Sequence, residues 1–265
     1  MNALYDAHCH LQDPRFGDDV EGIVAACRAR GIAKMVVNGT RESDWDRVAA
    51  LAERFPDLVI PSYGLHPWWS RERSPRWRED LEDRLRANPI AAIGETGLDR
   101  WMENPDPADQ EEVLVAHLDL ATRLNRPLSL HCLRSWGQLL DVLKAHSRPA
   151  RGFLLHSYGG PAEMVRAFAD LGAYFSFAGY FLNPPQEKKR AAFRLVPAER
   201  LLIESDAPDQ ALPEELDEFS LRDPATGKRL NHPANVPAIY QHWPAAEPDQ
   251  VEANFHRLFA FGGTR

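Results

Sequence analysis

The chain has 265 residues, 44% of them hydrophobic, and a formal net charge of −8 at pH 7. This length suits one α/β barrel, and the acidic balance disfavours a protein that holds DNA or an anionic membrane through a broad basic surface. Three cysteines without paired spacing indicate a reducing compartment, and no apolar run approaches the ~20 residues needed to cross a bilayer. We expect a cytoplasmic monomer with one domain over residues 1–265 and no obligate protein partner.

Short apolar runs alternate with longer amphipathic segments along the chain, a pattern typical of repeated βα units. The apolar runs predict strands at Leu4–Ala7, Lys34–Val37, Val59–Tyr63, Ile90–Ile93, Leu128–Leu130, Gly152–Leu155, Tyr174–Phe177 and Leu201–Ile203. The amphipathic segments predict helices at Asp18–Arg30, Ser43–Arg54, Ala108–Leu124, Ser135–His146 and Pro161–Leu171. Eight parallel strands close a barrel, so the predicted fold class is α/β, a (β/α)8 TIM barrel.

The segment 209–233 breaks this rhythm because it is rich in Pro, Asp and Glu and has little apolar periodicity. We expect a long loop after the eighth strand, in a position where barrel loops often shape access to a substrate. Its acidic residues are Asp209, Glu214, Glu215, Asp217, Glu218 and Asp223. Beside the barrel mouth this negative charge would repel a polyanion.

Polar residues gather where the predicted strands end, which is where the loops of a barrel build an active site. The first strand runs into His8 and His10, and residues two apart in extended chain point to the same side. The other strand ends carry His66, Glu95, His131, His156 and Asp206. A lone histidine is more often a packed core residue than a ligand, but so many convergent polar groups would be costly without a shared partner.

Imidazoles mixed with carboxylates are typical ligands of divalent metals. The candidate ligands are His8, His10, Glu95, His131, His156 and Asp206. This number of ligands, with one carboxylate able to bridge, predicts two divalent ions per chain, with zinc, manganese and magnesium as candidates.

Several of these runs resemble the TatD-type metal-dependent hydrolases, which are barrels of the amidohydrolase-like superfamily. They are Asp6-Ala7-His8-Cys9-His10-Leu11, Gly64-Leu65-His66-Pro67-Trp68, Ala92-Ile93-Gly94-Glu95-Thr96-Gly97-Leu98-Asp99, His131-Cys132, His156-Ser157-Tyr158 and Glu204-Ser205-Asp206-Ala207-Pro208. The late run Asn254-Phe255-His256-Arg257-Leu258-Phe259 is similar to the C-terminal helix of that family. The resemblance implies that one ion is bound by His8, His10 and Asp206, that Glu95 bridges, and that His131 and His156 bind the second ion.

The resemblance also implies an activity, the hydrolysis of phosphodiesters by removal of nucleotides from DNA ends, as in a 3′–5′ deoxyribonuclease. We expect the catalytic residues to be Asp206 as proton acceptor, Glu95 as bridge and His66 as donor to the scissile phosphate. Nearby candidates for contacts with DNA or a nucleotide are Arg100, Arg134 and Trp68, although each can equally be a solvated or packed loop residue.

Two other functions stay open at this point. A small-molecule hydrolase, such as a lactonase, amidase or deaminase, could use the same metal pair, and the acidic segment 209–233 favours it. The chain also departs from the family pattern at Leu133, Arg100-Trp101 and Asn231-His232-Pro233, none of which is a candidate ligand. A non-catalytic barrel scaffold is the second alternative, although a scaffold has no need of six convergent polar groups.

Overall fold

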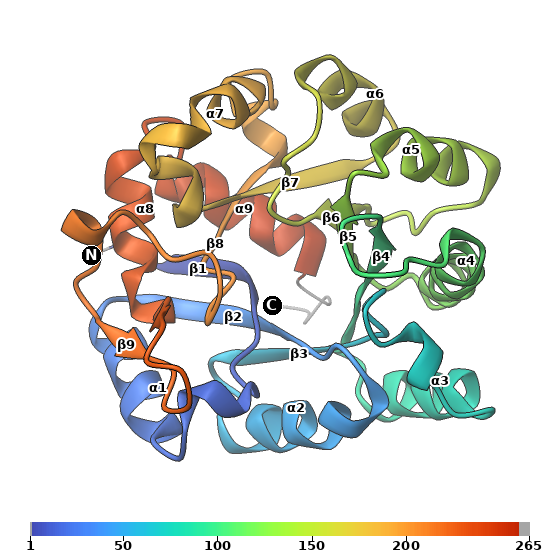
Figure 1. Ribbon diagram of the computed structural model, residues 1–265, viewed down its shortest axis with the longest axis horizontal. Helices are drawn as coiled ribbons and strands as arrows, with labels where there is room; N and C mark the ends of the chain where they lie inside the picture. The colour runs from blue at the N-terminus through green and yellow to red at the C-terminus, as the bar shows by residue number, and fades with distance from the viewer. Residues whose placement is uncertain (1, 260–265) are drawn as a thin grey trace.

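The computed structural model describes residues 2–259, and its centre is a barrel of eight parallel strands in chain order (Figure 1). The strands are β1 Leu4–Cys9, β2 Ile32–Asn38, β3 Val59–Tyr63, β4 Ala92–Asp99, β5 Leu128–Leu133, β6 Phe153–Leu155, β7 Ala173–Ala178 and β8 Leu201–Glu204. Every residue of β3, β4 and β7 is buried, as expected for parallel strands covered on both faces. The predicted (β/α)8 barrel is confirmed.

The barrel closes where its last strand meets its first. The amide of Asp206 donates to the carbonyl of His8 at 2.9 Å, and the amide of His10 donates to the carbonyl of Ala207 at 2.8 Å. These backbone bonds place the residues that follow β8 directly beside those that end β1.

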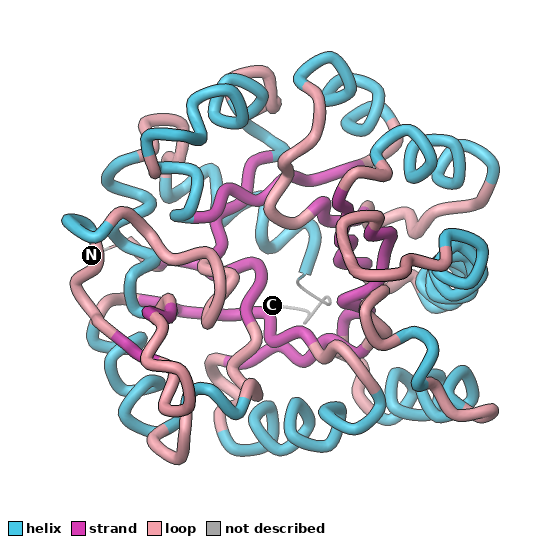
Figure 2. The backbone as a smooth tube through the Cα atoms, in the orientation of Figure 1, coloured by secondary structure: helices cyan, strands magenta, loops and turns pink. Residues whose placement is uncertain are grey.

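Helices surround the strands (Figure 2), and residues 2–259 include none that is long and apolar enough to cross a membrane. They are α1 Val20–Ala29, α2 Glu42–Arg54, α3 Trp77–Ala87, α4 Pro107–Leu124, α5 Trp136–Ala145, α6 Val165–Asp170, α7 Glu187–Phe193, α8 Val236–His242 and α9 Pro248–Phe259. Local signals set several boundaries. Asp106 caps the start of α4 by accepting from the amide of Asp109, and Asn125 ends that helix in a left-handed conformation.

The strands differ from the predicted ones mainly at their ends. β4 begins at Ala92 because Ile90 is exposed and lies in a turn. In this turn the amide of Ile90 donates to the side-chain oxygen of Asn88. Its carboxyl end continues through Asp99 instead of stopping at Ile93, since residues 96–99 pair in register with β5. Glu95 and His131 therefore lie inside strands. Polar residues interrupt the apolar run in the sequence, but strand pairing resumes at Thr96 after a register shift that includes Glu95.

Three helices lie outside the segments that the sequence analysis predicted as helices: α3, α7 and α8. The segment 209–233 is not a plain loop, because two short antiparallel strands fold it back on itself, β9 Leu221–Arg222 and β10 Arg229–Leu230. Its apolar residues Leu212 and Leu230 are buried. These two residues anchor the segment on the barrel although they show no periodicity in the sequence.

Candidate metal centre

The structure brings the predicted site residues together at the carboxyl ends of the strands. Six of them line one cavity of about 450 Å³: His10, His66, Glu95, His131, His156 and Asp206. The seventh, His8, is fully buried behind them. Residues from six strands or the turns after them thus meet in one place, as a barrel requires.

Glu95 lies between two groups of imidazoles. Its Oε2 atom is 3.3 Å from Nε2 of His8 and 3.3 Å from Nε2 of His10. Its Oε1 atom is 3.0 Å from Nδ1 of His131 and 2.8 Å from Nε2 of His156. One carboxylate therefore faces two separate pairs of nitrogen atoms, which is the arrangement that a bridging ligand requires.

The inward nitrogens of two ligand histidines carry lone pairs. Nδ1 of His10 bonds to the carbonyl oxygen of Asn38 at 2.8 Å, so it carries the ring proton and leaves Nε2 as an acceptor. Nε2 of His131 faces the Asp99 carboxylate at 3.2 Å, which leaves its Nδ1 as an acceptor in the same way. Both acceptors face oxygens of Glu95, which also cannot donate. Only a cation, a proton or a metal ion, makes these contacts favourable.

The charges of the site create the same demand for cations. Burial opposes ionisation of Glu95, yet the surrounding imidazoles, led by His156, hold the pKa of that carboxyl well below its usual range. Burial likewise opposes protonation of His10, but hydrogen bonds to Asp206 and Glu95 raise its pKa well above the usual value. A divalent metal can replace such protons, and this mixture of nitrogen and oxygen donors suits zinc or manganese.

Asp206 completes the group on the β1 side. Its Oδ1 atom lies 3.7 Å from Nε2 of His8 and 3.6 Å from Nε2 of His10. Its Oδ2 atom accepts a 2.7 Å hydrogen bond from Gln210, which also donates to Ser157. The carboxylate is therefore oriented with one oxygen toward the two histidines.

His66 differs from His10 and His131 because its inward nitrogen carries a proton. Its Nδ1 atom accepts from the amide of Trp68 at 3.2 Å, so Nε2 is the protonated nitrogen, and it lies 3.4 Å from Oε1 of Glu95. Burial lowers the pKa of His66 to about 3, which keeps the ring neutral. Its ring is close enough to Glu95 and His131 to join a metal group, but this tautomer makes it a hydrogen-bond donor instead.

A family model described as TatD related DNase matches residues 5–259. The chain belongs to the TatD-related DNase family. It is 31% identical over 257 residues to the 3'-5' ssDNA/RNA exonuclease TatD of Edwardsiella piscicida, covering 95% of this chain and 94% of that protein. It is 33% identical over 209 residues to the uncharacterized metal-dependent hydrolase YjjV of Escherichia coli, covering 78% of this chain and 80% of that protein.

Solved structures agree with this assignment. The crystal structure of the Escherichia coli TatD homologue YjjV has a TM-score of 0.85 and 29% identity to this chain and covers 98% of each. A TatD family hydrolase from Entamoeba histolytica has a TM-score of 0.83 at 17% identity, which shows the shared fold. The resemblance found in the sequence motifs is thus confirmed, and the chain is a metal-dependent hydrolase of the TatD family.

Sequence reasoning missed the residues of this TatD-family site that hold the ligands in place. Asp99 contacts His131, and Glu204 is fully buried, 3.8 Å from Nδ1 of His156, where it accepts from the amide of Ser157 at 2.7 Å. A signal for Asp99 was present, because residues four apart in an extended strand share a face and Asp99 follows Glu95 at that spacing. Glu204 stands two residues before Asp206, so the same even spacing gave a signal there as well.

The predicted substrate contacts are only partly placed at the cavity. Trp68 lines it and donates from Nε1 to Asp99 at 2.7 Å. Arg134 is exposed and lies 4.7 Å from the ring centre of Trp101, which lines the cavity. Arg100 is not on the cavity wall and bonds to Gln138, so the expectation of a substrate contact has no geometric support there.

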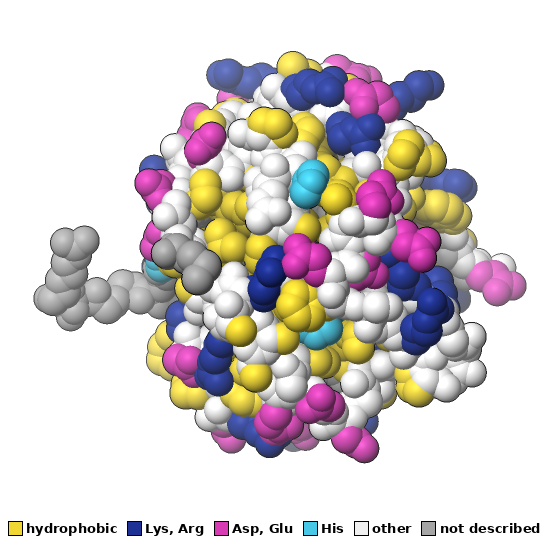
Figure 3. All heavy atoms as spheres, turned by 90° about the vertical axis from the view of Figure 1, so that its left-hand side faces the viewer, with side chains coloured by type: hydrophobic (Ala, Val, Ile, Leu, Met, Phe, Trp, Pro, Cys, Tyr) yellow, Lys and Arg dark blue, Asp and Glu magenta, His cyan; other side chains and the backbone are white. Residues whose placement is uncertain are grey.

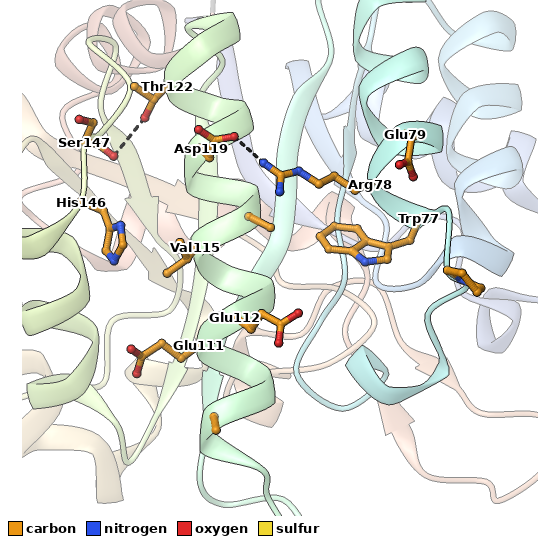
Figure 4. A pocket seen from close by; sticks show the side chains of 13 residues that line it. Trp77, Arg78, Glu79, Glu111, Glu112, Val115, Asp119, Thr122, His146 and Ser147 are labelled. Atoms are coloured by element: carbon orange, nitrogen blue, oxygen red, sulfur yellow. Dashed lines mark hydrogen bonds and ion pairs between the residues drawn. The ribbon is translucent and has the colours of Figure 1, made fainter.

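A second hollow of about 1100 Å³ lies on the outside of the barrel, between α3 and α4 (Figure 4). Arg78 of α3 reaches across it to Asp119 of α4, and His146 stands on the far side of α4. Within residues 2–259, the His, Asp and Glu groups close enough to share a metal all lie at the barrel mouth. The hollow is therefore separate from the candidate metal centre of this TatD-family chain.

Proposed function

We propose that this TatD-family hydrolase removes nucleotides from the 3′ ends of single-stranded DNA or RNA by using two divalent cations. The position of Glu95 between two pairs of imidazoles carries the proposal. One cation would be held by His8, His10, Asp206 and Glu95. The other would be held by Glu95, His131 and His156. The orientation of the inward lone pairs of His10 and His131 supports this ligand set.

Bound divalent cations would supply an acidified water and would polarise the phosphodiester. The protein groups then divide the proton transfers between them. The carboxylate of Asp206 lies on the cavity wall and can accept the proton of the attacking water. His66 presents its Nε2–H to the cavity, so it can donate a hydrogen bond to a phosphoryl oxygen.

Two observations favour a nucleic acid over a small neutral substrate. The relative from Edwardsiella piscicida is named for action on single-stranded DNA and RNA. Arginines pair with three of the six acidic residues of the segment 209–233: Asp209 with Arg15, Asp217 with Arg229 and Glu218 with Arg30. These pairs weaken the repulsion that favoured a lactonase, amidase or deaminase.

The cavity wall also suits unpaired bases. The aromatic rings of Trp68, Trp69 and Trp101 line it, and base stacking on such rings is worth about 1–3 kcal/mol per base. A cavity of about 450 Å³ lies within the range of ligand pockets. We further propose that the chain works in the cytoplasm as a monomer. The three free, buried cysteines support the cytoplasmic location because reducing surroundings leave thiols unpaired.

The proposal is tested with a single-stranded oligonucleotide labelled at its 5′ end. Incubation with manganese, zinc or magnesium should produce a ladder that shortens from the 3′ end, and purified protein should contain two metal equivalents by elemental analysis. A lactone and an amide assayed in parallel should not be hydrolysed. A lactone hydrolysed faster than the oligonucleotide, or an oligonucleotide left intact with every metal, would contradict the proposal.

A further inference from the structure

Four basic side chains line the cavity that contains the metal cluster: Arg15, Arg41, Arg47 and Lys189. Arg15 is held by Asp13 and Asp209 through contacts of 2.8 and 2.7 Å, so its charge is already balanced. Within residues 2–259, Arg41, Arg47 and Lys189 form no ion pair with a carboxylate. This sets them apart from most arginines on the outer helices, such as Arg78, which pairs with Asp119.

Arg41 lies at the start of α2, where its guanidinium is 4.3 Å from the ring centre of Trp69. The residue is half-buried. Stacking on an aromatic ring restricts the guanidinium to one orientation but leaves its N–H groups free at the edge. Arg41 is thus a positioned donor without an internal acceptor.

Lys189 reaches the same cavity from α7. Its ammonium group lies 5.7 Å from the ring centre of Tyr180 and 5.9 Å from that of Phe181, and it is half-buried. Burial lowers the pKa of Lys189, as expected for a cation that has lost water and gained no carboxylate. A bound anion would restore the missing interaction.

The two residues are on either side of the metal cluster. Arg41 follows β2 and Lys189 lies between β7 and β8, and in the barrel order β8 and β1 stand between them. Figure 1 shows α2 and α7 on opposite sides of these two strands. Because β1 and β8 carry His8, His10 and Asp206, a chain that contacts both basic residues must pass over the metal ligands.

We propose that Arg41 and Lys189 bind the backbone phosphates next to the hydrolysed phosphate, so that the site selects a strand of several nucleotides over an isolated phosphodiester. The inference rests on the proposed function. Stacked arginine and unpaired lysine are both common phosphate ligands.

Local cations matter because the overall charge of the molecule does not favour attraction of the strand. Its formal net charge is −8 at pH 7. On the side of the barrel shown in Figure 3, basic and acidic side chains are interspersed and form no continuous basic area. The unpaired cations inside the cavity would supply a local attraction for a polyanion.

Binding of fluorescein-labelled hexathymidylate, followed by anisotropy without added metal, tests the pair independently of catalysis. Arg41→Gln and Lys189→Gln should each weaken binding about tenfold. Each should also lower the slope of log Kd against the logarithm of the salt concentration by about 0.7. This is the value for one phosphate contact on a single strand. The matched controls Lys188→Gln, beside Lys189 but exposed, and Arg166→Gln on α6 should bind like the wild type.

Activity separates this inference from the proposed function. With manganese, both cavity variants should lose at least five times more kcat/KM on the hexanucleotide than on bis(p-nitrophenyl) phosphate. Equal losses on the two substrates, or wild-type binding and salt dependence in both variants, would overturn the phosphate-binding role. A wild-type protein that hydrolyses neither substrate would contradict the proposed function, while the anisotropy results would still decide the role of Arg41 and Lys189.

Discussion

Three histidines of the site, His10, His66 and His131, have one ring nitrogen bonded to the protein, and this bond decides what the other nitrogen can do. The carbonyl of Asn38 and the carboxylate of Asp99 accept hydrogen bonds from the outer ring N–H groups of His10 and His131, so the inward nitrogens are acceptors. His66 is the reverse case, because its outer nitrogen accepts from a backbone amide. The three rings have the same chemistry in the sequence, but the structure separates ligands from a donor.

Replacement of Glu95 by Gln tests the bridge. The amide keeps the shape of the side chain but removes the charge that faces both imidazole pairs, so we expect loss of bound metal and at least about a 100-fold loss of activity. Elemental analysis and steady-state kinetics measure the two effects, with circular dichroism as the check on folding. Glu112→Gln on the exposed face of α4 is the matched control. A Glu95→Gln protein with two metals and full activity would disprove the bridge.

Asp99 should act as a positioning residue for the β5 side of the site. Its Oδ2 atom contacts both His131 and the indole nitrogen of Trp68, while Oδ1 accepts from the amide of Trp101. Asp99→Asn places an amide group against these two donors, and we expect manganese affinity to fall about 10- to 100-fold. Titration calorimetry measures it, with the exposed Asp141→Asn as control. Unchanged affinity in Asp99→Asn would contradict the role.

At the scale of elements, α4 supports the loop that carries His66. His117 of α4 is fully buried, and its Nε2 atom accepts from the amide of Leu65, just after β3. Its Nδ1 atom bonds to the carbonyl of Val113 within the same helix at 2.7 Å. The helix is thus connected by a neutral imidazole to the backbone of the residue before His66.

This contact predicts a pH-dependent contribution to stability. Burial lowers the pKa of His117 to about 4, below its value of about 6.5 in an unfolded chain. As pH falls from 6.5 to 4, the unfolded chain binds a proton that the folded chain does not, so stability decreases, by up to about 3 kcal/mol. Above pH 6.5 the two states are both neutral and this contribution is constant.

Urea unfolding at pH 7.5 and pH 5 measures the effect. The loss of unfolding free energy between these values should be smaller in His117→Gln than in the wild type, even though the variant is less stable at both. His146→Gln, which changes an exposed histidine after α5, should keep the wild-type difference. An identical pH dependence in His117→Gln and wild type would show that His117 is not held neutral.

For the molecule as a whole, the site concentrates imidazoles and carboxylates whose mutual contacts are favourable only with cations present. We therefore expect divalent metals to stabilise the fold, by about 4 kcal/mol at a concentration 1,000 times Kd. Thermal unfolding should show a higher Tm with manganese than with a chelator. Glu95→Gln should lose most of this shift, and a chelator that leaves the wild-type Tm unchanged would argue against bound metal.

The barrel and most of its site could be predicted because their signals are local. Eight apolar runs indicate the strands, and His8 and His10 share a side through their spacing alone. The ion pairs of the acidic segment 209–233 could not be predicted where the partner is remote in the chain. Asp209 is neutralised by Arg15, which is 194 residues away in the chain and comes beside it only when β8 meets β1.

Closure of the barrel also decided which residues share the cavity. Arg41 enters it from the start of α2 and Lys189 from α7, and both look like ordinary surface charges in the sequence, whereas Arg100 looks equally suitable and lies outside the cavity. Strand periodicity and motif spacing are properties of neighbouring residues, so they specify the elements and the ligand types. Contacts between distant residues depend on how the elements pack, and only the tertiary structure determines them.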